Sequence, residues 1–71
     1  MATKRNGVPC YDKAGLDEPI FVLRAQDVLA DEVVAFWASR ARENGVSAEK
    51  IREARECAVA MQKWPGRKNP D

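Results

Sequence analysis

The chain has 71 residues, which allows one small domain at most and limits the size of any hydrophobic core. Twelve basic and eleven acidic side chains give a net charge of +1, unlike the basic surface of proteins dedicated to duplex nucleic acid. No apolar run is long enough to span a membrane, and the start MATKRNG lacks the hydrophobic segment of a signal peptide. We therefore expect a cytoplasmic protein with neither a membrane nor duplex nucleic acid as its partner.

The residue types that most enzymes need are scarce. The chain contains no histidine, which removes the commonest general base and most catalytic zinc sites. It has no glycine-rich phosphate loop, and no metal-binding pattern surrounds Cys10 or Cys57. Cys57 is expected as a buried thiol, with a Cys10–Cys57 disulfide as the alternative. We expect no enzymatic activity, no cofactor and no metal.

The first segment, residues 1–18, is polar and rich in turn formers, which favours a flexible arm that docks through Val8 and Tyr11. Pro19 then introduces the stretch IFVLRA, which is β-branched and aromatic at its start. The residue before a proline favours extended backbone, and such side chains favour strands. These features predict a short strand at residues 20–25.

Two helices follow the predicted strand. The first has apolar residues at the spacing of one buried helix face: Leu29, Val33, Phe36 with Trp37, and Ala41. Asp27 or Asp31 is expected to cap its start, and Asn44-Gly45 to end it. The second begins after Ser47, ends before Pro65-Gly66 and has its own stripe: Ile51, Ala54, Cys57 with Ala58, and Met61.

The link between the helices is short, which predicts an antiparallel helical hairpin. Charged residues alternate along residues 49–56, typical of a solvated helix face with pairs such as Arg52–Glu56. The expected organisation is an arm at 1–18, a strand plus helical hairpin at 19–65, and a basic-acidic tail at 66–71. The fold class is mainly α, and a lone strand needs a partner, so we expect a homo-oligomer in which two copies pair their strands.

Polar side chains cluster where the predicted strand ends. Arg24 either pairs with Asp27, Asp31 or an acidic residue of another copy, or presents its guanidinium to a phosphate or carboxylate. Gln26 both donates and accepts, as recognition of a nucleobase requires. Asp27 is expected to hold Arg24 or to cap the helix.

Three further residues complete the candidate ligand site. Trp37 and Trp64 are interpreted either as core aromatics or as a stacking surface for a planar ligand. Lys68 belongs to a basic cluster with Lys63 and Arg67, which is either solvated or a phosphate-contacting lip.

The stretches DEPIFVLRAQDVLADEVVAFW and KIREARECAVAMQKWPGRKNPD resemble a group of small proteins encoded by tailed phages and prophages. The signature elements are Phe21 to Asp27, Trp37, Trp64-Pro65, Lys68 and Pro70-Asp71, and the resemblance covers about residues 17–71. It implies an accessory protein acting against host defence in a bacterial cell. Some such proteins sequester cyclic nucleotide immune signals, and others block a host protein.

The sequence therefore favours a small, non-enzymatic phage-type protein that binds and sequesters an anionic ligand, a cyclic nucleotide in particular. The first alternative is a protein-interaction module that inhibits or adapts a host protein. The second alternative is a nucleic-acid-binding regulator, which the near-neutral charge disfavours.

Overall fold

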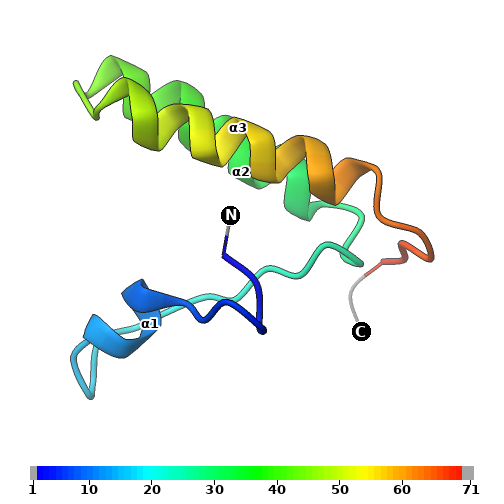
Figure 1. Cartoon of the computed structure of the whole chain (residues 1–71), viewed down its shortest axis with the longest axis horizontal. Helices are drawn as coiled ribbons and strands as arrows, with labels where there is room; N and C mark the ends of the chain where they lie inside the picture. The colour runs from blue at the N-terminus through cyan, green and yellow to red at the C-terminus, as the bar shows by residue number, and fades with distance from the viewer. Residues whose placement is uncertain (1, 70–71) are drawn as a thin grey trace.

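The structure, a computed structural model, describes residues 2–69. Within this range the chain forms three helices, α1 (Pro9–Lys13), α2 (Ala30–Glu43) and α3 (Ala48–Gln62). The helices α2 and α3 pack against each other as a hairpin, and α1 stands apart from them (Figure 1). No Cα atom of α1 comes within 8 Å of either helix. The mainly helical fold and the hairpin are confirmed, and α1 was not predicted.

The hairpin turn is closed by local hydrogen bonds. The amide of Val46 donates to the carbonyl of Ala41 at 3.0 Å, and the amide of Gly45 donates to that of Arg42 at 3.2 Å. This pair of bonds is the Schellman motif, which requires a left-handed residue after the helix. Gly45 supplies it with a φ of +76°. The predicted end of the first helix is therefore confirmed.

The starts of the two helices differ in how they are capped. The hydroxyl of Ser47 accepts the amide of Lys50 at 3.3 Å, so the predicted cap of α3 is confirmed. The helix α2 has Leu29 at its N-cap position and no side-chain cap. Asp27 stabilises the turn that precedes α2, because its Oδ1 accepts a hydrogen bond from the amide of Leu29 at 2.8 Å.

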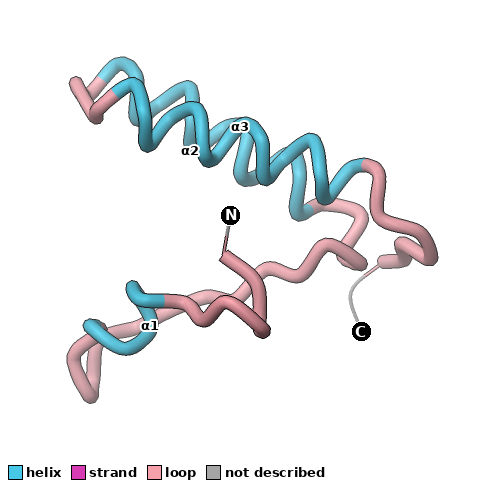
Figure 2. The backbone as a smooth tube through the Cα atoms, viewed as in Figure 1, coloured by secondary structure: helices cyan, strands magenta, loops and turns pink. Residues whose placement is uncertain are grey.

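The predicted strand at residues 20–25 is wrong. This segment is loop that ends in a turn (Figure 2). The bridges formed within residues 2–69 are the isolated ones Thr3–Gly7 and Asp27–Lys68. Extended backbone becomes a strand only where a neighbouring segment pairs with it. Phe21 and Val22 instead stay 85% and 70% exposed. The expected strand pairing between copies therefore loses its basis.

The predicted buried face is right for α3, whereas on α2 only its last member, Ala41, is buried as predicted. On α3, Ala58 is buried and Ile51, Ala54, Cys57 and Met61 are half-buried, as the stripe predicts. On α2 the predicted residues Leu29, Val33 and Phe36 are exposed, Phe36 by 68%. The buried positions are Ala30, Ala38 and Ala41.

The close approach of two helices explains this rotation of α2. The helix packs against a single other helix, so only a narrow stripe of its surface is covered. Alanine in that stripe lets the two backbones approach closely, and the larger apolar side chains then point away. Within residues 2–69 the buried residues are four alanines, Ala30, Ala38, Ala41 and Ala58.

Candidate functional site

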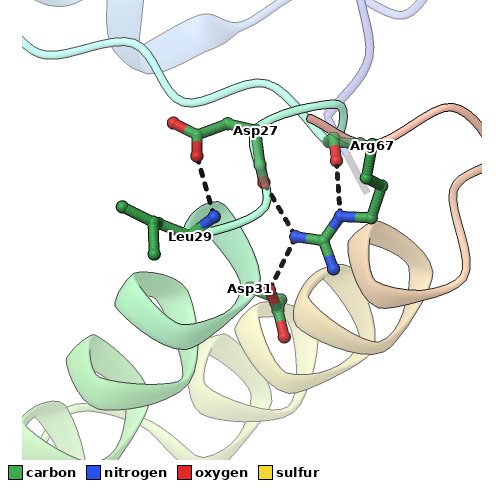
Figure 3. Close-up of polar contacts among 5 residues, drawn as sticks. Asp27, Leu29, Asp31 and Arg67 are labelled. Atoms are coloured by element: carbon green, nitrogen blue, oxygen red, sulfur yellow. Dashed lines mark hydrogen bonds and ion pairs between the residues drawn. The ribbon is translucent and has the colours of Figure 1, made fainter. Parts of the chain in front are cut away.

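The segment before α2 is held in place by Arg67, from the other end of the chain. Its Nε donates to the carbonyl of Ala25 at 3.1 Å, and its Nη2 donates to the carbonyl of Asp27 at 2.7 Å. The same Nη2 pairs with Oδ1 of Asp31 at 2.6 Å (Figure 3). The guanidinium thus ties the chain before α2 and the first turn of α2 to the C-terminal segment.

Backbone hydrogen bonds reinforce this connection. The amide of Lys68 donates to the carbonyl of Gln26 at 2.7 Å, and the amide of Val28 donates to the carbonyl of Lys68 at 2.9 Å. The C-terminal segment therefore runs parallel to residues 26–28. We call this set of contacts, made by Arg67 and Lys68 with residues 25–31, the C-terminal clamp.

Asp31 carries the electrostatic signature of the clamp. The hydrogen bond from Arg67 lowers the pKa of the Asp31 carboxyl below its ordinary value of 3.8, against a smaller opposing effect of desolvation. Sequence reasoning missed this pair and placed Arg67 with the basic tail. Nothing local in the sequence marks it, because the partners are 36 residues apart.

A cavity of about 330 Å³ opens beside the clamped segment. Its wall combines the N-terminal segment, residues 23–26 and the last turns of α3. The lining residues are Ala2, Thr3, Lys4, Leu23, Arg24, Ala25, Gln26, Cys57, Ala60, Met61 and Trp64. Residues from three separate parts of the sequence therefore meet around one hollow.

Three of the predicted ligand-binding residues line this cavity: Arg24, Gln26 and Trp64. The Nη2 of Arg24 donates to Oε1 of Gln26 at 3.3 Å, which orients the guanidinium. Lys4 adds a second cation that sequence reasoning missed, since it lies in the arm. We call this hollow the Arg24 cavity.

The other three predicted residues lie elsewhere. Asp27 supports the start of α2, and Lys68 belongs to the clamp through its backbone. Trp37 lines a second cavity of about 460 Å³ between the N-terminal segment and the hairpin, together with Cys10 and Cys57. Both cysteines are free thiols, so the alternative of a disulfide is not formed.

The predicted ion pairs of the arginines are replaced by others. The ion pairs within residues 2–69 are Arg40–Glu43 and Arg67–Asp31, so Arg24 pairs with neither Asp27 nor Asp31. The predicted Arg52–Glu56 pair is likewise not among them. Arg24 is exposed and lines the cavity.

Comparisons of the chain with protein families, curated proteins and solved structures find no match. In the described part of the chain, no helix is both long and apolar enough to cross a bilayer. The site is therefore interpreted from its own geometry.

Proposed function

We propose that the protein is a non-enzymatic binding protein that takes up an anionic ligand with a planar ring, of the nucleotide class. The observation that supports this is the meeting of Arg24, Gln26 and Trp64 around one cavity. From the sequence, Arg24 was interpreted either as an ion-pair residue or as an anion donor, and Trp64 either as a core aromatic or as a stacking surface. Gln26 was interpreted as a base-recognising amide. Their convergence is what a nucleotide site requires.

Each residue has a distinct role in this proposal. The planar guanidinium of Arg24 binds a phosphate through two parallel hydrogen bonds, and Lys4 adds a point charge on the other wall. The amide of Gln26 orients Arg24 and contacts a base edge. Trp64 is 55% exposed, and its indole offers a face for stacking.

The size of the cavity limits the ligand. A volume of about 330 Å³ is at the low end of the range for small-molecule sites, about 300 to 1,000 Å³. A mononucleotide suits this volume better than a cyclic dinucleotide, which would extend beyond the cavity. In the cell, this binding would sequester a cyclic nucleotide immune signal, as the resemblance to phage proteins implies.

The test is calorimetric titration with adenosine and guanosine monophosphates, their cyclic forms and a panel of cyclic dinucleotides. We expect the parent to bind at least one of them and Arg24→Ala to lose about tenfold or more in affinity. Arg24→Lys should recover little, because an ammonium does not reproduce the planar fork. The matched control is Arg52→Ala, which removes the same charge from a cavity at the hairpin turn.

Failure of the parent to bind any nucleotide would overturn the proposal. Equal losses in Arg24→Ala and Arg52→Ala would show that net charge, rather than the Arg24 cavity, drives binding. Light scattering on each variant separates a lost ligand site from a lost assembly.

A second candidate function is a protein-interaction module that inhibits or adapts a host protein. It is favoured by the large apolar side chains left exposed on α2 and in residues 16–22. The two candidates differ in which surface does the binding, so variants of Arg24 and of Phe36 distinguish them.

A further inference from the structure

Two apolar surfaces of the chain are exposed to solvent. The first is the outer stripe of α2, formed by Leu29, Val33 and Phe36. The second is residues 16–22, where Leu16 and Phe21 are almost fully exposed. In Figure 1 the second surface belongs to the part of the chain that stands away from the hairpin, next to α1.

The total exposed area is too large for a lone compact chain. The accessible surface is 6150 Å², whereas a compact chain of 7.9 kDa exposes about 4,400 Å², so the excess is roughly 1,700 Å². The radius of gyration of 12.8 Å likewise exceeds the value of about 11 Å for a compact domain of this length. The chain is therefore more open than its length requires.

The interior is also too small to stabilise the chain by itself. The buried residues within 2–69 are four alanines, and none of the larger apolar side chains joins them. Small domains need an additional source of stability, and neither a disulfide nor a metal cluster is present in the described part. What covers the apolar surfaces must therefore be present whenever the chain folds.

We propose that these two surfaces form the interface of an obligate homodimer, in which a second copy covers the α2 stripe and residues 16–22. A second copy is available wherever the chain is made, whereas a host protein is not always bound. The excess of roughly 1,700 Å² belongs to the whole chain; an interface that covered all of it on both chains would bury about 3,400 Å², within the range of obligate homodimers. A two-fold interface lets each copy offer the same pair of surfaces.

This interface replaces the strand pairing predicted from the sequence and is separate from the Arg24 cavity. Neither Phe36 nor Phe21 lines that cavity. Dimerisation and nucleotide binding are therefore testable with different variants.

The first test is sedimentation and thermal unfolding of the full chain from about 1 to 500 μM. We expect a folded species of two chains, with a Tm that rises with protein concentration because unfolding and dissociation are coupled. A folded monomer with a Tm independent of concentration would overturn the proposal, and so would an assembly of an odd number of chains.

The second test locates the interface. Phe36→Glu and Phe21→Glu should each raise the concentration for half-dissociation by about tenfold or more. The matched control, Val59→Glu, places the same charge at an exposed apolar position of α3 and should keep the parent's mass. Parent-like dimers in both phenylalanine variants would show that another surface forms the interface.

Discussion

The side chain of Arg67 makes three hydrogen bonds, yet its sequence neighbourhood looks like a solvated tail. Its guanidinium bonds two carbonyls and the carboxylate of Asp31, and its side chain is 16% exposed. At this burial the donors keep more of their strength than at an open surface. The residue therefore positions the segment that carries Arg24 and Gln26.

Removing the side chain of Arg67 should destabilise the folded protein. We expect Arg67→Ala to lower the free energy of unfolding by about 2 to 4 kcal/mol, because three hydrogen bonds are lost and Asp31 is left unpaired. Arg67→Lys should recover little of it, since an ammonium does not reach all three acceptors. Urea denaturation measures the change, with Arg40→Ala as the control, because it removes an exposed pair worth less than about 1 kcal/mol.

The Asp31 carboxyl predicts a pH dependence. Its pKa is lowered in the folded chain, mainly by the hydrogen bond from Arg67, so its contribution is present above the unfolded pKa and is lost as pH falls through the folded pKa. The stability difference between the parent and Asp31→Asn should be constant from about pH 8 to 5 and shrink below about pH 4. Thermal melts across this range test it, and a difference that does not shrink as the pH falls below about 4 would indicate a packing role instead.

At the scale of the elements, the stripe of alanines decides which face of α2 meets α3. Ala38 is fully buried on this stripe, whereas Ala35 on the same helix is exposed. The same substitution can therefore be made at a buried and at an exposed position of the same helix.

Replacing alanine by a larger side chain should change the stability of the protein differently at Ala38 and at Ala35. We expect Ala38→Leu to destabilise the protein by about 1 to 3 kcal/mol, because the extra volume forces the two helices apart. Ala35→Leu should change stability by less than about 0.5 kcal/mol. Chemical denaturation of both variants measures this, and similar effects at the two positions would mean that the helix faces are assigned wrongly.

At the scale of the whole molecule, the near-neutral charge sets how binding responds to salt. The Arg24 cavity contains two cations, Arg24 and Lys4, in a chain of net charge +1. A ligand bound there releases few counterions, whereas a protein with six to ten phosphate contacts loses about 10³ to 10⁵ in affinity between 50 and 200 mM salt.

We therefore expect nucleotide affinity to fall only a few-fold over that range of salt. Titrations at the two salt concentrations measure the slope, with short duplex DNA as the comparison ligand. A steep slope together with tight duplex binding would favour the nucleic-acid-binding regulator.

The sequence by itself determined the features whose causes are local. Ser47 and Gly45 mark the ends of the helices because a hydroxyl cap and a left-handed glycine act within a few residues of themselves. The buried stripe of α3 follows from its spacing, and Arg24 and Gln26 are close in sequence, so their joint presence at the cavity was predictable.

Only the tertiary structure decided the rest. The face of α2 depends on how closely one neighbouring helix approaches, so alanines are buried there and Phe36 is left outside. Residues 20–25 have strand-like side chains, but no segment of the described chain forms a bridge with their backbone. Arg67 reaches its partners across 36 to 42 residues, a distance over which no local pattern acts.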